Sequence, residues 1–146
     1  MKTRQFLMVV MCLFAAAAHP GAADQTAFVE SQKRLAAQGD AWAQSALGFL
    51  YSHGQGVPRD YAVALTWYRL AAAQGNANAQ FNLGVMYFKG RGVPRDYAAA
   101  LTWYRLAATQ GDIDAQFNLG VMYAHGQGVP RDYTAALTWF RLAAAQ

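Results

Sequence analysis

The stretch Gly-Gln-Gly-Val-Pro-Arg-Asp-Tyr at residues 54–61 decides the fold, because it returns with one substitution at residues 90–97 and unchanged at residues 126–133. Each start lies 36 residues after the previous one. The complete copies align without insertion or deletion as residues 39–74, 75–110 and 111–146. A repeated unit of this length cannot bury its apolar face alone, so the copies are predicted to stack into a solenoid with one continuous core.

Each copy is predicted to contain two helices joined by the glycine-rich stretch, near residues 40–53 and 60–73 in the first copy. Asp60 is suited to cap the second helix, since its carboxylate can accept the first free backbone amides. Gly54 follows the first helix, where glycine tolerates the left-handed conformation that ends a helix. Gly48 lies inside the first helix at a cost of about 1 kcal/mol relative to alanine. We therefore expect a neighbouring helix or a bulky ring to approach Gly48 closely.

The second predicted helix of each copy has an apolar stripe at helical spacing. In the first copy this inward stripe contains Tyr61, Ala64, Leu65, Tyr68, Ala71 and Ala72. Thr66 and Arg69 are predicted to face solvent. In the second copy Phe81, Val85 and Phe88 form a further stripe, which we expect to be buried between adjacent repeats.

The fixed positions of the copies resemble the Sel-one-like repeat family. In the first copy the pattern is Ala43, Leu47-Gly48, Tyr51, Gly54, Gly56-Val57, Asp60, Ala64, Trp67-Tyr68, Ala71-Ala72 and Gly75. The resemblance extends over all three copies, with Phe140 in place of the tyrosine in the third. It implies an all-α fold, a right-handed α/α superhelical solenoid of three 36-residue helix-turn-helix repeats. It also implies a scaffold or adaptor that acts between proteins.

One cysteine-rich branch of that family is associated with binding or cleaving β-lactams, and its repeats contain paired cysteines. Cys12 is the only cysteine of this chain. It lies before the repeats, so the resemblance to this branch does not extend to the residues that define it. The β-lactam activity is therefore not carried over to this sequence.

The first 23 residues are predicted to be a secretory signal peptide. Lys2 and Arg4 precede an apolar run of thirteen residues, 6–18, and a His-Pro-Gly breaker follows it. The run is shorter than the ~20 residues of a membrane-spanning helix. Cleavage after Ala23 would leave a periplasmic or secreted chain without cysteine. The net charge would fall from +4 to +2, with arginines spread evenly along the repeats, which is unlike a nucleic-acid-binding surface.

Residues 24–38 align with the second helix of a repeat but are more polar, which is typical of a terminal capping helix. At the other end the last predicted helix has no polar cap after it. Trp139, Leu142 and Ala143 are expected to form an exposed apolar edge there. Self-association through this edge, fraying of the last helix and truncation of a longer array remain open alternatives.

Differences between the copies predict where a partner binds. In arrays related to this family the first helix of each pair lines the concave surface. One polar and varied stripe follows these helices and contains Trp42, His53, Asn78, Asn82, Lys89, Asp114, Asn118 and His125. Asparagine amides can bond an extended peptide backbone and Trp42 can supply an aromatic anchor. The stripe therefore predicts a protein or peptide partner, the alternative being a plain solvated surface.

No residues of the repeats are predicted to be catalytic or to hold a metal or cofactor. His53 and His125 lie two repeats apart, too far to share a metal ion at ~10 Å per helix layer. Ser52 adjoins His53, but consecutive residues of a helix are expected to point apart. Asp60, Asp96 and Asp132 are assigned to helix capping rather than to an acid–base pair.

The sequence thus favours an exported, non-enzymatic repeat adaptor that binds a protein or peptide along its concave face. The main alternative is an envelope-associated hydrolase that acts on β-lactams or peptidoglycan. A second alternative is a fragment of a longer repeat array. Turnover of a chromogenic substrate would separate the hydrolase from the adaptor.

Overall fold

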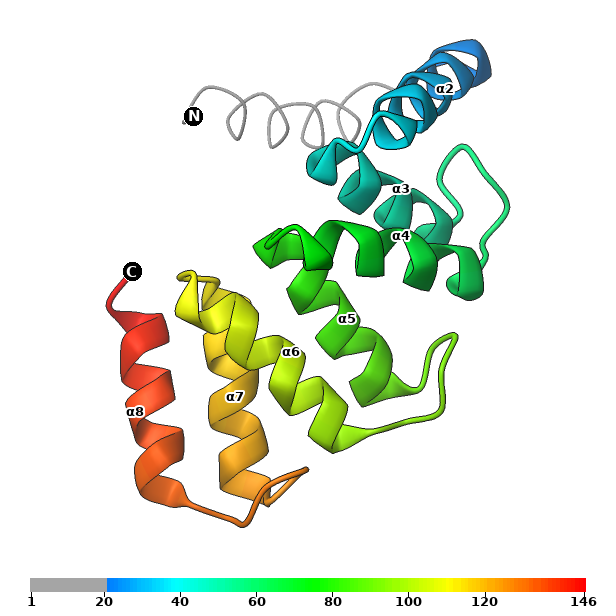
Figure 1. The fold of residues 1–146 in the computed structure, drawn as a ribbon. Helices are drawn as coiled ribbons and strands as arrows, with labels where there is room; N and C mark the ends of the chain where they lie inside the picture. The colour runs from blue at the N-terminus through cyan, green and yellow to red at the C-terminus, as the bar shows by residue number, and fades with distance from the viewer. Residues whose placement is uncertain (1–20) are drawn as a thin grey trace.

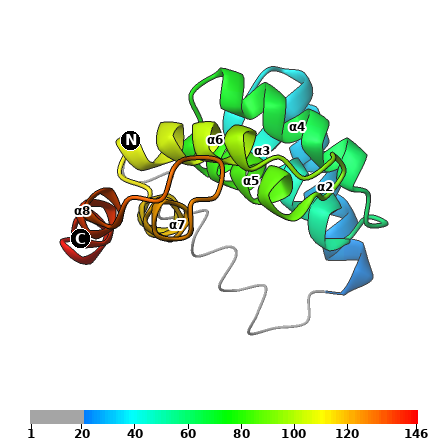
Figure 2. The ribbon, with the colours of Figure 1, turned by 90° about the horizontal axis from the view of Figure 1, so that it is seen from below.

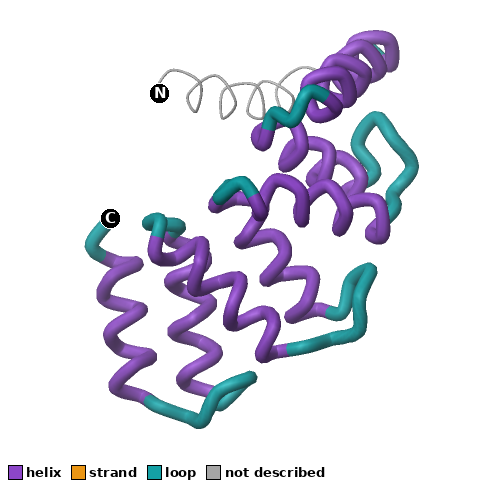
Figure 3. Tube along the Cα trace, viewed as in Figure 1, coloured by secondary structure: helices purple, strands orange, loops and turns teal. Residues whose placement is uncertain are grey.

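The computed structural model describes residues 21–146, and every regular element in that part of the chain is an α-helix (Figure 3). The helices are α2 (Ala22–Ala37), α3 (Ala41–His53), α4 (Tyr61–Ala73), α5 (Ala77–Lys89), α6 (Tyr97–Thr109), α7 (Ile113–His125) and α8 (Tyr133–Ala144). The expected all-α fold is confirmed, and the expected helix bounds of the first repeat agree with α3 and α4 within one residue.

The helices form a curved row, from α2 at one end to α8 at the other (Figure 1). Helices α3 and α4, α5 and α6, and α7 and α8 form the closest pairs, and each pair packs on the next through neighbouring helices. Seen from below, α7 and α8 lie side by side at one end of the row, with α8 outermost (Figure 2). This arrangement is the helical repeat solenoid that the 36-residue period predicts.

Polar side chains cap the N-termini of the helices at the predicted positions. The carboxylate of Asp60 accepts the backbone amides of Ala62 and Val63 at 2.9 and 3.0 Å, and Asp96 and Asp132 accept equivalent amides at the start of α6 and α8. First helices are capped in the same way by Asp40, Asn76 and Asp112. These caps satisfy amides that a helix leaves unpaired in its first turn.

Glycines act both at helix ends and inside the first helices. Gly54 ends α3 with a φ of 68°, in the left-handed region, as predicted. Inside α3, a Cβ at position 48 would lie 2.5 Å from Cδ1 of Tyr68, and Gly120 has the same relationship to Phe140. The expected approach of a bulky ring to this glycine position is therefore confirmed.

Buried side chains cluster across the repeat boundaries. One cluster joins Leu65, Tyr68 and Ala72 of α4 to Leu83 and Met86 of α5. Equivalent clusters join α6 to α7 and α2 to α3. The buried core therefore continues from the second helix of one pair to the first helix of the next, which makes neighbouring repeats interdependent.

The predicted inward stripe of α4 is buried largely as expected, whereas the stripe predicted between repeats is less buried than expected. The expected inward residues of α4 are buried except for Tyr61, which is half-buried, while Thr66 and Arg69 are exposed as predicted. Phe81, Val85 and Phe88 are only half-buried, and they pack against the cluster that α6 and α7 form.

Buried glutamines connect the repeats through polar contacts. Gln80 of α5 donates its amide to the carbonyl of Ala72 in α4 at 3.4 Å, and it accepts the amide of Gln110 at 2.7 Å. Gln44 and Gln116 make the same pair of contacts in the other repeats. These contacts satisfy a polar side chain that would otherwise be costly to bury.

Helix α2 packs on α3 as a second helix of a preceding repeat would. Val29 and Ala36 of α2 are buried against Ala43, Leu47 and Leu50. The helix starts at Ala22 and ends at Ala37, so it begins two residues before the capping segment predicted from the sequence. Residues 1–20 of the predicted signal peptide lie outside the described residues. Among the helices from residue 21 onward, none is long and apolar enough to cross a bilayer.

Candidate functional site

All eight residues of the predicted binding stripe reach the surface. Trp42, Asn78 and Asp114 lie in the first turns of α3, α5 and α7, and they are exposed. Near the other end of the same helices lie His53, Lys89 and His125, which are also exposed. Asn82 and Asn118 lie between these two rows and are half-buried.

In the first two repeats the first helices lie closer to each other than the second helices do, as expected for the inner side of a curved row. Helix α3 contacts α5 across the repeat boundary, and no pair of second helices in residues 21–146 makes contact of that extent. Trp42 and His53 are eleven residues apart on one helix, about 16 Å along its axis at 1.5 Å per residue. The structure therefore spreads the stripe over an extended surface instead of gathering it around one point.

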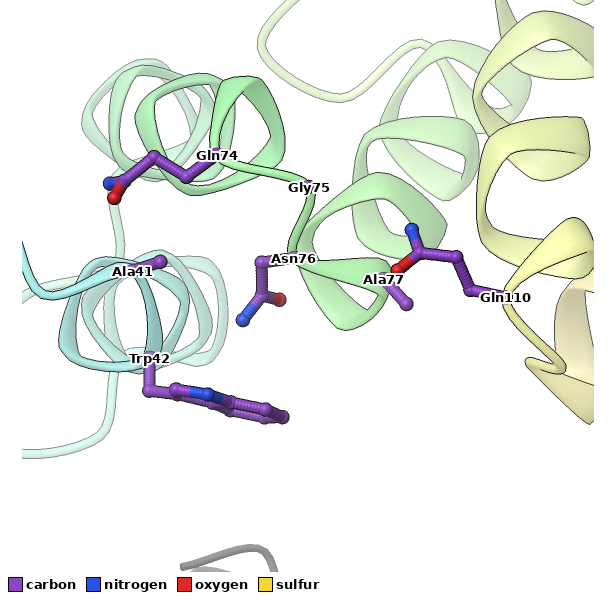
Figure 4. Close-up of a pocket in the computed structure, with 7 residues that line it drawn as sticks. All are labelled: Ala41, Trp42, Gln74, Gly75, Asn76, Ala77 and Gln110. Carbon is purple, nitrogen blue, oxygen red and sulfur yellow. The ribbon is translucent and has the colours of Figure 1, made fainter. Parts of the chain in front are cut away.

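Trp42 borders a groove of about 290 Å³ at the junction of the first two repeats. The groove lies between the start of α3 and the turn from α4 to α5, and Figure 4 shows the indole extending along its open side toward Asn76. The lining consists of Ala41, Trp42, Gln74, Gly75, Asn76, Ala77 and Gln110. Trp42 is 41% exposed there, so a large aromatic ring is available to a ligand.

Gln74, Asn76 and Gln110 in this groove were not predicted as site residues. Asn76 is buried because its side chain caps α5, and the amide groups of Gln74 and Gln110 donate to Gln44 and Gln80. The carbonyl oxygens of Gln74 and Gln110 accept no hydrogen bond within residues 21–146 and can receive a ligand donor. The Gln-Gly pairs at residues 74–75 and 110–111, which recur at the repeat period, are the signal that could have identified them.

Hydrogen bonds fix the centre of the stripe. The hydroxyl of Ser45 in α3 donates to Oδ1 of Asn78 at 3.0 Å, and the amide of Asn82 donates to the same oxygen at 3.1 Å. Asn78 is thus held from two sides although the residue is exposed, and its amide nitrogen donates no hydrogen bond within residues 21–146. A donor held in this way loses little conformational entropy on binding a carbonyl.

The two histidines of the stripe are oriented by their own helices. Nδ1 of His125 lies 2.9 Å from the carbonyl of Val121, and Nδ1 of His53 lies 3.0 Å from that of Phe49. A carbonyl only accepts hydrogen bonds, so each Nδ1 carries the proton and Nε2 of the neutral ring is left as an acceptor. His53 also stacks on Phe49, with ring centroids 4.1 Å apart.

The expectation that Ser52 and His53 point apart is wrong. Oγ of Ser52 lies 2.8 Å from Nδ1 of His53, because both side chains bend back toward the carbonyl of Phe49. Within residues 21–146 no carboxylate forms a hydrogen bond with either side chain. The pair therefore lacks the third group that orients the base in a serine–histidine–carboxylate triad.

The acidic residues serve other purposes in this part of the chain. The described residues contain no group of three or more histidine, cysteine or acidic side chains placed to hold a metal ion. Asp112 caps α7 and its pKa is raised mainly by burial, while the amide of Ala115 opposes this shift. The nearby carboxylate of Asp114 also raises the pKa of Asp112, while Asp112 itself is engaged as the helix cap.

The fold and this surface define an α-helical repeat solenoid with an extended inner face. The Sel1 repeat model matches residues 43–76, 77–112 and 113–146. The chain belongs to the Sel1 repeat family, which confirms the resemblance found in the sequence. The Sel1 repeat fold is typical of scaffolds for protein–protein interaction.

Solved structures with this fold include two of substantial sequence identity. One is c5321, a protective antigen present in uropathogenic Escherichia coli strains displaying an SLR fold, with 41% identity and a TM-score of 0.80 over 84% of this chain. The other is a Sel1 repeat protein from Oxalobacter formigenes, with 42% identity and a TM-score of 0.71 over 75% of this chain. The chain spans 26% and 43% of the lengths of these two structures.

A third structure shares the fold at lower identity. Helicobacter pylori cysteine rich protein B is 18% identical, with a TM-score of 0.67 over 86% of this chain and 90% of its own. At that identity the likeness concerns the fold alone. No curated protein matches the chain.

Proposed function

We propose that the chain is an exported adaptor that binds a protein or peptide along the inner face of α3, α5 and α7. The observation that carries this proposal is the exposed Trp42, which borders a groove with unpaired carbonyl acceptors. Large aromatic residues are common anchors of protein interfaces. The buried scaffold beneath the face is nearly the same in each repeat, whereas the exposed stripe differs from repeat to repeat.

An extended peptide fits the chemistry of this face. Asn78 offers an oriented amide donor, and Gln74 and Gln110 offer acceptors, so the face can pair with both backbone groups of a strand. Lys89 lies at the C-terminal end of α5, between His53 and His125 at the equivalent ends of α3 and α7, and it can bind a carboxylate of the partner. Trp42, in the first turn of α3, would contact an apolar side chain of the partner.

Export is part of the proposal. Its support is the pair Lys2 and Arg4 before the apolar run of residues 6–18. Cleavage after Ala23 would place the mature chain in the periplasm or outside the cell. The α2 helix begins at Ala22, so cleavage there would remove only its first two residues.

Affinity capture from a periplasmic extract tests the binding proposal. The bait is the purified mature chain, compared with a variant that combines Trp42→Ala, Asn82→Ala and Lys89→Ala. A matched control combines Thr66→Ala, Thr102→Ala and Arg59→Ala, which removes one positive charge and three exposed side chains away from the inner face.

The proposal expects a partner that the native chain and the control retain and that the inner-face variant loses. Circular dichroism must show that both variants remain folded. Equal retention by all three baits would place the binding site elsewhere. Hydrolysis of a chromogenic β-lactam or a peptidoglycan fragment by the native chain would contradict a purely adaptor function.

A further inference from the structure

The cap of α5 differs from the caps of the other two first helices. Asp40 caps α3 and Asp112 caps α7, whereas α5 is capped by Asn76. Each cap accepts the backbone amide three residues later, at 2.9 Å for Asn76 and Ala79. An aspartate side chain presents only acceptors, but an asparagine also has an amide nitrogen that can donate. The junction of the first two repeats therefore has a donor that the caps of α3 and α7 lack.

The amide nitrogen of Asn76 is directed into the groove beside Trp42. The hydrogen bond from Ala79 to Oδ1 fixes which end of the Asn76 side chain faces its own helix. Nδ2 donates no hydrogen bond within residues 21–146, although Asn76 is only 7% exposed. Figure 4 shows Nδ2 on the side of Asn76 that faces α3 and the indole of Trp42. A buried donor without an acceptor is costly, so an acceptor atom of a ligand would stabilise this arrangement.

The start of α5 adds two backbone donors. The amides of Ala77 and Asn78 belong to the first turn of the helix and have no acceptor within residues 21–146. This turn is also the positive end of the helix dipole. None of the seven residues that line the groove is acidic. Together these groups favour a ligand atom that carries negative charge and accepts several hydrogen bonds.

The start of α7, at the next repeat junction, has the opposite chemistry. Its cap is Asp112, and Asp114 lies in its first turn, where α5 has no acidic residue. Two acidic side chains at one helix start disfavour an anion there. The position of Trp42 is occupied by Asn78 at this second junction, so the aromatic ring is missing as well. The groups that suit a negatively charged ligand are therefore found at the start of α5 and not at the start of α7.

We propose that the groove between Trp42 and the start of α5 binds a carboxylate of the peptide partner. Nδ2 of Asn76 and the first-turn amides of α5 donate to its oxygens, and an apolar side chain next to the carboxylate lies against the exposed ring of Trp42. The inference rests on the proposed peptide-binding function and adds the chemical group that this part of the inner face selects. A C-terminal carboxylate and the side chain of an aspartate or glutamate both supply that group.

Three pools of short random peptides test the proposal and separate these two sources. Every peptide has a fluorescent label, leucine at its last position and no acidic residue at the random positions. The first pool ends in a free carboxylate and the second in an amide, while the third ends in an amide and has aspartate before the leucine. Fluorescence anisotropy during titration with the purified chain gives the half-saturating concentration of each pool. The first or the third pool should bind at least about tenfold more tightly than the second, because the second lacks the charged acceptor.

Asn76→Asp tests the donor without removing the cap. The substitution reproduces the cap that α3 and α7 already have, so the melting temperature should stay near that of the native chain. It replaces Nδ2 by a carboxylate oxygen, so the preference for a carboxylate pool over the amide pool should disappear. Asn76→Ser also keeps a good cap, adds no charge and should reduce the preference several-fold. Thr102→Asp adds the same charge at an exposed site of α6 and should leave the preference unchanged.

The outcomes separate this inference from the proposed function. Equal binding of the three pools, together with weaker binding to a Trp42→Ala variant, would overturn the carboxylate site but leave a peptide-binding inner face. A carboxylate preference that the folded Asn76→Asp variant retains would also overturn the site, because another group, such as Lys89, would then bind the carboxylate. The absence of saturable binding of any pool to the native chain would contradict both proposals.

Discussion

Gly84 lies directly against the ring of Tyr104. A Cβ at position 84 would be 2.5 Å from Cδ1 of this buried tyrosine and 3.0 Å from its Cγ. The missing side chain lets α6 approach α5 closely enough for the ring to enter the core. The same relationship between Gly48 and Tyr68 shows that it belongs to the repeat and not to one position.

Substitution of Gly84 is therefore expected to destabilise the array. Gly84→Ala should lower the free energy of unfolding by about 1–3 kcal/mol, the usual cost of overpacking. This cost outweighs the roughly 1 kcal/mol by which alanine is favoured over glycine inside a helix. Gly84→Leu should be more damaging. Urea unfolding followed by circular dichroism measures both effects.

Gly120→Ala provides the matched control for this prediction. Its ring partner, Phe140, is half-buried at the outer edge of the array and has more room to move than Tyr104. The loss of stability should accordingly be smaller at position 120. Unchanged unfolding of Gly84→Ala would show that close packing does not account for the glycine.

The glutamine contacts lead to a second prediction. Gln80→Leu removes the hydrogen bond to Ala72 and the one from Gln110, while it keeps a side chain of similar size. At about 1 kcal/mol for each hydrogen bond, the free energy of unfolding should fall by roughly 2 kcal/mol. Denaturant titration measures the change. A stability equal to that of the native chain would mean that the contacts contribute nothing net.

Alkaline pH should unfold the protein through its buried tyrosines. Burial raises the pKa of Tyr68 to about 12, although the hydroxyl of Ser52 opposes the shift, and it also raises the pKa of Tyr104. The unfolded chain releases these protons near pH 10, before the folded chain does. Stability is therefore complete below pH 10 and falls as the pH rises toward 12, by about 2 kcal/mol or more for Tyr68.

Melting temperatures between pH 9 and pH 12 measure this loss. Tyr68→Phe should flatten the decline, and the third repeat already has Phe140 at the equivalent position. Tyr133→Phe is the control, because Tyr133 is 65% exposed. An equally steep decline in the native chain and the Tyr68→Phe variant would contradict this explanation.

The proposed export makes a simple prediction for the mature N-terminus. When the chain is expressed with residues 1–23 in a Gram-negative bacterium, the periplasmic product should begin at Asp24. Intact-mass measurement and N-terminal sequencing identify the first residue. A product that retains Met1 and stays in the cytoplasm would contradict the proposal.

The sequence predicted the repeats because their signals are local and occur three times. Asp60 as a cap and Gly54 as a helix end follow from backbone chemistry at single positions. The sequence predicted that a helix or a bulky ring lies against Gly48. It did not identify the ring as that of Tyr68, because this contact depends on how α3 packs on α4. The constant spacing of residues within each repeat was therefore enough to predict the helices and most of the buried residues of α4.

Contacts between repeats were harder to predict. The hydrogen bond from Gln74 to Gln44 joins residues 30 positions apart, so no local sequence pattern predicts it. The contact between Ser52 and His53 was missed because helical spacing alone ignores side chains that bend back to one carbonyl. The Trp42 groove was missed in part because its other walls are turns between repeats.

Photo-cross-linking from the inner face tests the central claim most directly. Benzoylphenylalanine replaces Asp114 on the inner face in one variant and Thr102 on the outer side of α6 in another, both at exposed positions. After illumination of cells that express the chain, the proposal predicts a protein adduct from position 114 and none from position 102. An adduct from position 102 alone, or none from either, would contradict an adaptor that binds through its inner face.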